Sequence, residues 1–296
     1  MDKRIDVYLI AGQSNAVGMA RLDLLDDQYK REYPHVWLFN GGDGPREEHL
    51  RWVPVRPGQG SIAVGIPMFG PELGMASALQ QADAPVAFIK YAHGGTAIYR
   101  NADLNNKPDN HDNWHGPWDG VAPAADLSQV NESTSGRLYT ECLMTIRAGL
   151  AQLREQGYTP VIRGLAWMQG ETDGEIQFNN DKHQAAPVYA HNLSALFAAF
   201  RRELSDIAGQ DLTHMPIVFG EINRFSRCIC QAEAIVAAQM AVGREPGNHL
   251  VLTEDLPIDP AIDEWHWNGN EEFFLGVRFG ETLRAALSDG SLHDIL

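Results

Sequence analysis

Short apolar runs alternate along the chain with longer segments of helical periodicity. The runs have the length of buried strands, and their apolar residues are mostly consecutive, as expected where both faces of a sheet are covered. This alternation is typical of an α/β fold with a central, mostly parallel sheet. The predicted strands are Ile5–Ala11, Val86–Ala92, Val161–Met168, Ile217–Gly220 and Leu250–Thr253, and the predicted helices are Gly70–Gln81, Gly136–Gln156, Ala186–Leu204, Gln231–Gly243 and Asn270–Leu287.

Two long segments rich in Gly, Pro, Asn and Asp interrupt this pattern, at Gly41–Pro67 and Thr96–Ser135. Loops of this length inside a compact domain are uncommon, and they usually serve as lids or binding loops. The chain shows no internal repeat and no low-complexity linker. We therefore predict one domain over residues 1–296, in which the two segments are inserted loops that cover a site.

The charge composition of the chain argues against one class of binding partner, nucleic acid. The 296 residues include 23 Lys plus Arg and 39 Asp plus Glu, so the formal net charge is −16. This balance argues against nucleic acid, because affinity for the phosphate backbone comes mainly from clustered cations. Hydrophobic residues make up 44% and charged residues 21% of the chain, which is typical of a globular protein. The chain is therefore expected to bury a core and to bind something other than nucleic acid.

The number of cysteines and the N-terminal sequence indicate the cellular compartment in which the protein is expected. Three cysteines cannot form a fully paired disulfide framework, and this favours a reducing environment. The apolar stretch Ile5–Ala11 is too short for a signal-peptide core or a membrane span. The sequence thus predicts a cytoplasmic protein without a membrane partner, or a secreted or periplasmic one if a leader has been removed.

The residues that follow the predicted strands are the most informative for chemistry, because ligands of an open parallel sheet bind beyond the carboxyl ends of its strands. The first strand is followed by Gly12–Asn15, the second by His93–Thr96 and the third by Gln169–Asp173. The last strand leads through a Pro-containing connection to Asp263–His266, just before the final helix. We expect these four segments to meet at one edge of the sheet.

Together the four segments contain the parts that ester hydrolysis by acyl transfer requires. Ser14 is the candidate nucleophile, His266 the general base and later acid, and Asp263 the group that orients the imidazole. The backbone N–H groups of Ser14 and Gly95 and the side-chain amide of Gln169 are candidate donors to the oxyanion.

In this order, the four segments resemble the SGNH/GDSL hydrolase superfamily, and most of all its sialic-acid-specific acetylesterase-like group, which includes carbohydrate esterase family 6. The run Phe69–Leu73 at the start of a predicted helix is also similar to a segment of that group. The motifs extend from Gly12 to His266, so the resemblance covers nearly the whole chain. It implies a three-layer α/β/α sandwich of the flavodoxin-like type, and serine esterase chemistry without a metal or cofactor. The implied reaction removes acetyl groups from carbohydrates.

The resemblance assigns the same roles to the same five residues, with two points left open. The broader superfamily has Asn in its third block, where this chain has Gln169, as the carbohydrate esterase group does. Glu171, two residues further on, is an alternative to Asp263 as the acid that orients the histidine, or an auxiliary to it. We favour Asp263, and we keep His93 as an alternative base.

Other polar and aromatic residues near these segments are candidate substrate contacts. Gln13, Asn15, Arg100 and Trp265 are the candidates, and Arg100 is a possible partner for a sugar carboxylate. Trp114, Trp118 and Trp267 either stack on sugar faces or anchor loops. The Asp/Asn-rich stretch Asp103–Asp112 fails the spacing of a calcium loop, so no metal is predicted.

The leading hypothesis is a serine esterase that removes O-acetyl groups from acetylxylan, related acetylated sugars or O-acetyl sialic acid. Two alternatives remain. One is an esterase or thioesterase of the same fold that acts on a non-carbohydrate acyl group, because fold alone does not set the substrate. The other is a carbohydrate-binding protein without catalysis.

Overall fold

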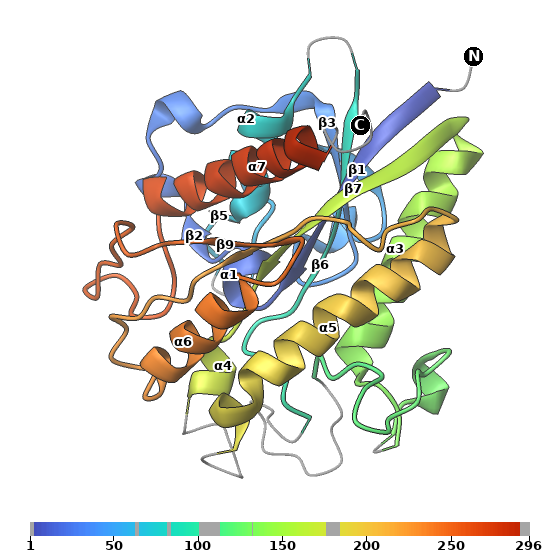
Figure 1. Ribbon diagram of the computed structural model, residues 1–296. Helices are drawn as coiled ribbons and strands as arrows, with labels where there is room; N and C mark the ends of the chain where they lie inside the picture. The colour runs from blue at the N-terminus through green and yellow to red at the C-terminus, as the bar shows by residue number, and fades with distance from the viewer. Residues whose placement is uncertain are drawn as a thin grey trace.

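The computed structural model describes residues 3–62, 65–81, 84–100, 113–131, 133–175 and 184–290, with side chains described up to residue 288 (Figure 1). A seven-stranded sheet in the order β4-β3-β6-β1-β7-β8-β9 forms the centre. Its strands are β1 (Lys3–Gly12), β3 (Tyr33–Asn40), β4 (Trp52–Val55), β6 (Val86–Ala92), β7 (Tyr158–Met168), β8 (Ile217–Gly220) and β9 (Asn248–Val251). A separate two-stranded ribbon pairs β2 (Ala20–Arg21) with β5 (Met68–Phe69).

All neighbouring strands of the large sheet run parallel except β4, which is antiparallel to β3. The central strand β1 pairs with β6 on one side and with β7 on the other, so the carboxyl ends of all three lie at the same edge. The predicted class, a mostly parallel α/β sheet, is confirmed.

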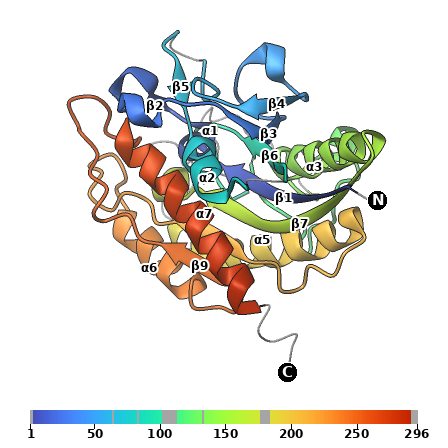
Figure 2. The ribbon, with the colours of Figure 1, turned by 90° about the horizontal axis from the view of Figure 1, so that it is seen from above.

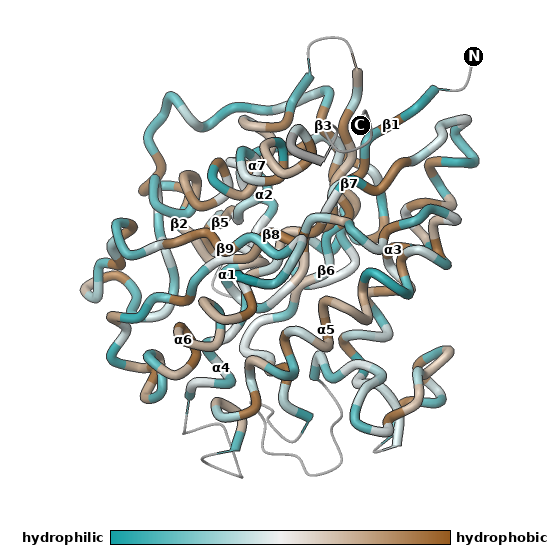
Figure 3. Tube along the Cα trace, viewed as in Figure 1, coloured by the Kyte–Doolittle hydropathy of each residue, from teal (hydrophilic) through white to brown (hydrophobic). Residues whose placement is uncertain are grey.

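Helices cover both faces of the sheet and complete the three layers (Figures 1 and 2). In the tube view, hydrophobic and hydrophilic residues alternate along these helices, as expected when one side packs on a sheet (Figure 3). The helices α2 (Pro71–Leu79) and α7 (Asn270–Gly290) pack together on one face. The other face carries α3 (Arg137–Glu155) and α5 (Ala185–Ala208), and α6 (Ala232–Val242) packs against α5.

The apolar core between these layers holds the fold together. It includes Trp167 on β7 and Phe197 and Phe200 on α5, all fully buried. The three cysteines, Cys142, Cys228 and Cys230, are free. Among the described residues, no helix combines the length and apolarity needed to cross a membrane.

All five predicted strands and all five predicted helices are present, and their ends differ by a few residues. The strand β7 starts earlier than predicted, so Pro160 lies inside it, opposite Ile5 of β1. This position tolerates proline because β8 pairs with β7 only from Leu165 onward, and a proline that lacks a neighbour on one side removes no sheet hydrogen bond.

Two strands of the large sheet escaped the sequence pattern, as did the two short strands of the separate ribbon. The strand β3 carries Pro34 and His35, which interrupt its apolar run. The strand β4 lies inside the segment 41–67, so the prediction that this segment is loop throughout was wrong. The edge strand β4 has only one neighbour and needs less apolar surface, whereas β3 lies inside the sheet between β4 and β6.

Candidate active site

The candidate nucleophile lies in a tight turn at the carboxyl end of β1. Gly12 has a φ of +137°, and a Cβ there would lie 2.0 Å from the carbonyl oxygen of Met168, so only glycine fits. The N–H of Gln13 donates to the same oxygen at 2.8 Å. Ser14 then opens the short helix α1 (Ser14–Val17) and lines a pocket of about 350 Å³. The turn therefore presents the hydroxyl at the edge of the sheet where the predicted segments were expected to meet.

The histidine that faces this serine is held by an aspartate three residues earlier. Nδ1 of His266 lies 2.7 Å from Oδ2 of Asp263. The other carboxylate oxygen, Oδ1, accepts the N–H groups of Trp265 at 2.7 Å and His266 at 3.2 Å. Burial raises the pKa of Asp263, but the hydrogen bond and charge of His266 and these two N–H groups outweigh it and hold the pKa below its usual value. Asp263 is therefore ionised near neutral pH and keeps Nδ1 as the donor.

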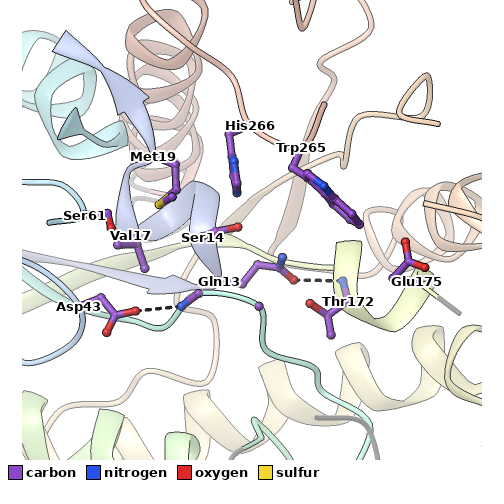
Figure 4. Close-up of a pocket in the computed structure, with 12 residues that line it drawn as sticks. Gln13, Ser14, Val17, Met19, Asp43, Ser61, Thr172, Glu175, Trp265 and His266 are labelled. Atoms are coloured by element: carbon purple, nitrogen blue, oxygen red, sulfur yellow. Dashed lines mark hydrogen bonds between the residues drawn. The ribbon is translucent and has the colours of Figure 1, made fainter. Parts of the chain in front are cut away.

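Ser14 and His266 line the same pocket, and the imidazole points toward the hydroxyl (Figure 4). Because Nδ1 faces Asp263, the nitrogen directed to Ser14 is Nε2, which is left as the proton acceptor. This is the arrangement that a general base and nucleophile require.

Glu171, the alternative acid, contacts a different partner. It opens the short helix α4 (Glu171–Gly174), and its Oε1 accepts the amide of Asn15 at 2.6 Å. Burial raises the pKa of Glu171, which favours the neutral form, and a neutral acid would stabilise an imidazolium poorly. The amide of Asn15 also reaches the carbonyl oxygen of Trp265 at 3.4 Å. The geometry thus gives the imidazole contact to Asp263, and it gives Glu171 the task of fixing Asn15 against the histidine loop.

Gln169 lies elsewhere than the sequence analysis expected. Its side chain is fully buried, and its Nε2 donates to the carbonyl oxygen of Thr96 at 3.0 Å and to Oδ2 of Asp173 at 2.6 Å. Its Oε1 accepts the hydroxyl of Tyr189 at 3.1 Å. Both amide hydrogens are therefore used inside the protein, and Gln169 does not line the pocket of Ser14. Its expected role as an oxyanion donor is corrected: it ties together the loops that follow β6 and β7.

Gln13 has the orientation that Gln169 lacks. Its Oε1 accepts the backbone N–H groups of Gly170 and Thr172, each at 3.4 Å. Because both partners are donors, the oxygen must face them and Nε2 must face the other way. Gln13 lines the pocket, and its amide lies between Ser14 and Thr172 in Figure 4. Nε2 of Gln13 is thus a side-chain donor directed into the pocket.

A second aspartate holds the Gly94–Gly95 turn that follows β6. Oδ2 of Asp43 accepts the N–H of Gly94 at 3.0 Å and lies 3.0 Å from Nδ1 of His93. Gly95 lines the pocket and has a φ of +65°, a conformation that glycine adopts without strain. Among the described residues, the N–H groups of Ser14 and Gly95 donate no hydrogen bond, so both remain available to a ligand. His93 does not line the pocket, so among the described histidines only His266 does.

A buried ion pair contacts the last residue of α1. Nζ of Lys90 lies 2.7 Å from Oε2 of Glu72 and donates to the carbonyl oxygen of Val17 at 2.8 Å. Both charged side chains are almost completely buried, and Oε1 of Glu72 accepts the N–H of Gly70. Removing one partner of such a pair leaves an unpaired buried charge. Glu72 belongs to the Phe69–Leu73 run, so this run contributes to the support of the helix that begins at Ser14.

The remaining substrate candidates divide into two groups. Trp265 lines the pocket, whereas Arg100 does not. Trp114 and Trp267 are fully buried, and their indole N–H groups donate to Thr96 and Leu256, so both anchor loops. Trp118 packs against His115. The stretch Asp103–Asp112 lies outside the described residues.

Several residues that line the pocket were not among the candidates from the sequence. For two of them, the only indication in the sequence was that they belong to a long loop expected to cover the site. Asp43 and Ser61 come from the segment 41–67. The others are near neighbours of the recognised motifs: Val17, Met19, Thr172 and Glu175.

A parallel α/β/α sheet whose strand-end serine shares a pocket with an aspartate-bound histidine has the architecture of a serine hydrolase. Comparison with protein families gives a more specific result. The chain belongs to the family described as "Carbohydrate esterase, sialic acid-specific acetylesterase", whose profile matches residues 4–285. It is therefore an ester hydrolase of the carbohydrate esterase class.

Three solved structures share the fold. A protein from Arabidopsis thaliana is 17% identical, with a TM-score of 0.64 over 95% of this chain and 98% of its own. NanS is 14% identical, with a TM-score of 0.62 over 98% of this chain and 99% of its own. A carbohydrate acetylesterase from Xanthomonas citri is 15% identical, with a TM-score of 0.58 over 96% of this chain and 56% of its own. The search of curated proteins gave no match.

Proposed function

We propose that this esterase removes O-acetyl groups from carbohydrates through an acetyl ester on Ser14. The observation that carries the proposal is that His266, with Nδ1 held by Asp263 at 2.7 Å, lines one pocket with Ser14. Membership of a carbohydrate esterase family supports a sugar ester as the substrate. The pocket's volume of about 350 Å³ is sufficient for an acetyl group and the atoms next to it.

The reaction follows from the positions of the three side chains. Oγ of Ser14 attacks the acetyl carbonyl carbon while Nε2 of His266 takes the hydroxyl proton. The carbon–oxygen bond to the alcohol then breaks, and the alcohol oxygen takes the proton from Nε2. A water molecule, deprotonated by the same nitrogen, then attacks the acetyl carbon. The bond between that carbon and Oγ breaks, Nε2 returns the proton to Oγ, and the acetic acid formed leaves and ionises to acetate. Asp263 stabilises the imidazolium in both halves of the reaction.

Negative charge develops on the carbonyl oxygen, and we assign three donors to it. They are the N–H groups of Ser14 and Gly95 and Nε2 of Gln13, all of which belong to residues that line the pocket. Donors that are already fixed in place stabilise the developing charge without reorganisation. Gln13 is fixed by the N–H groups of Gly170 and Thr172.

The proposal is tested by acetate release and by labelling. The purified protein is expected to release acetate from acetylated sugars, to prefer acetyl over longer acyl esters, and to be labelled at Ser14 by a serine-directed phosphonate, as located by peptide mass spectrometry. Activity that rises with acyl-chain length would favour the non-carbohydrate esterase. The absence of both labelling and acetate release would favour a binding protein.

The variant Gln13→Glu tests the third donor. It keeps an oxygen for the N–H groups of Gly170 and Thr172 but replaces Nε2 with a second oxygen that repels the oxyanion. We expect kcat for an aryl acetate to fall by about 10²–10³-fold, the usual effect of losing one oxyanion donor, with little change in KM. The melting temperature serves as the control for folding. A kcat equal to that of the wild type in a folded variant would contradict the assignment.

A further inference from the structure

The pocket of Ser14 continues into a second pocket on one side. The second pocket has a volume of about 530 Å³, and Asp43 and Ser61 line both pockets, so the two spaces meet at these side chains. In Figure 4, Asp43 and Ser61 lie on the opposite side of the site from Trp265 and Glu175. The side of Asp43 therefore has room for a group larger than acetyl, such as the alcohol part of an acetylated sugar.

Hydrogen bonds fix Asp43 at the junction of the two pockets. Its N–H donates to the carbonyl oxygen of Ala92 on β6 at 3.0 Å, and its own carbonyl oxygen accepts the amide of Asn40 at 2.9 Å. In the side chain, Oδ2 accepts the N–H of Gly94 and lies 3.0 Å from Nδ1 of His93. Oδ1 accepts no hydrogen bond from the described residues, and the side chain is 40% exposed. The carboxylate is thus held through one oxygen and open to a ligand through the other.

The carboxyl group of Asp43 is ionised near neutral pH. Burial raises the pKa of Asp43, but the hydrogen bond and charge of His93, the N–H of Gly94 and the charge of Lys90 outweigh it and hold the pKa below its usual value. Since part of the side chain faces solvent, dissolved salt screens this charge in part. Asp43 therefore places a negative charge at the junction of the two pockets.

The other groups around Ser14 do not supply a permanent positive charge. Within the described part of the chain, no lysine or arginine lines the pocket of Ser14, and a second carboxyl, that of Glu175, does line it. His266 is held by the carboxylate of Asp263. Arg46 lines only the second pocket. The formal net charge of −16 adds to the negative potential around the site.

We propose that Asp43 faces the alcohol part of the ester and selects against alcohols that carry a negative charge. The proposal rests on the proposed function, since it concerns the leaving group of the same reaction. Like charges a few ångströms apart at a protein surface repel strongly enough to suppress a wrong partner. Neutral acetylated sugars are then the preferred substrates. Sugars that carry a carboxylate, which include the sialic acids named in the description of the family, are disfavoured.

Two isosteric esters measure the repulsion. They are 3-acetoxybenzoate and 3-acetoxybenzamide, whose leaving groups differ in a carboxylate against a neutral amide. We expect Asp43→Asn to raise the ratio of kcat/KM for the benzoate to kcat/KM for the benzamide by about tenfold, the effect of removing one like charge near the substrate. The amide oxygen of asparagine can still accept the N–H of Gly94, and the ratio cancels any effect that is common to both esters. Added salt should raise the ratio in the wild type more than in the variant.

A second pair of esters tests the sign of the effect. 3-Acetoxyphenyltrimethylammonium and 3-tert-butylphenyl acetate have the same shape, and only the first is cationic. Asp43→Asn should lower the ratio of kcat/KM for the cationic ester to kcat/KM for the neutral one. Opposite shifts of the two ratios indicate a lost negative charge, whereas a displaced Gly94 turn would change the rates of all four esters together.

The matched control is Asp119→Asn. Asp119 also lies beside a histidine, with Oδ1 3.1 Å from Nε2 of His191, but it lines neither pocket. The variant removes the same formal charge from the protein and should leave both ratios unchanged. The melting temperatures of the two variants show whether each is folded.

Unchanged ratios in a folded Asp43→Asn, shifts of both ratios in the same direction, or equal shifts in Asp119→Asn would overturn the role of Asp43 while Ser14-dependent hydrolysis continues. The salt dependence can be measured in the wild type alone, and a benzoate ratio that falls as salt is added would contradict the proposal. If none of the four esters is hydrolysed in a way that depends on Ser14, the proposed function itself fails.

Discussion

Replacing Ser14 with alanine is expected to reduce hydrolysis of aryl acetates by about 10⁴-fold or more, close to the background rate. The variant lacks the only hydroxyl that the structure places at the turn after β1 within the pocket of His266. The oxyanion donors remain, so weak residual catalysis by direct attack of water is compatible with the mechanism. The measurement is kcat/KM, together with the amount of acetyl-enzyme trapped by rapid acid quenching.

Ser128→Ala provides the matched control for this experiment. Ser128 is an exposed serine in a short 3-10 segment and does not line the pocket. Its replacement should leave kcat/KM and the acetyl-enzyme yield unchanged. Because the hydroxyl of Ser14 makes no hydrogen bond among the described residues, we expect Ser14→Ala to keep the melting temperature of the wild type. Equal rates for Ser14→Ala and the wild type would exclude Ser14 as the nucleophile.

The second large effect is expected at the base. His266→Ala should lower kcat by about 10⁴-fold or more, since no other described histidine lines the pocket. Asp263→Asn should also lower kcat, by up to about 10⁴-fold, because an amide can donate to Nδ1 and so favour the wrong tautomer. Glu171→Gln should have a much smaller effect, because Glu171 contacts Asn15 and not the imidazole.

The three variants together decide between the two acids. A larger loss with Glu171→Gln than with Asp263→Asn would transfer the orienting role to Glu171. Activity retained by His266→Ala would place the base elsewhere, and His93→Ala would then be the next variant to measure. Since the pKa of Asp263 is held below its usual value, its carboxylate should stay ionised over the neutral range in which these rates are measured.

Site residues that come directly after a strand could be predicted from the sequence. Ser14 and Gly95 come within a few residues of the ends of β1 and β6, and parallel pairing of these strands brings the two turns together. Asp263 and His266 were predicted because they are three residues apart, and local geometry suffices to join Nδ1 and Oδ2. Such contacts depend little on how segments that are distant in the sequence pack together.

The two glutamines show where this reasoning failed. Gln169 and Gln13 both follow strands, and nothing in their local sequence tells which amide faces the ligand. Two of the three residues that bind the Gln169 side chain, Thr96 and Tyr189, are far from it in the sequence, and so are the N–H donors to Gln13. A long side chain turns toward whichever groups satisfy its donors and acceptors, and those groups are known only after folding.

By itself, the sequence determined the α/β class, five of the seven strands of the large sheet and the residues at their carboxyl ends, because strand length, apolar runs and parallel pairing are local or topological properties. Only the tertiary structure decided that Asp263 rather than Glu171 contacts the imidazole, that Gln13 rather than Gln169 faces the pocket, and that the segment 41–67 contributes Asp43 and Ser61 to the pocket of Ser14. These outcomes depend on side-chain directions and on hydrogen bonds between distant segments, which a pattern along one chain does not contain.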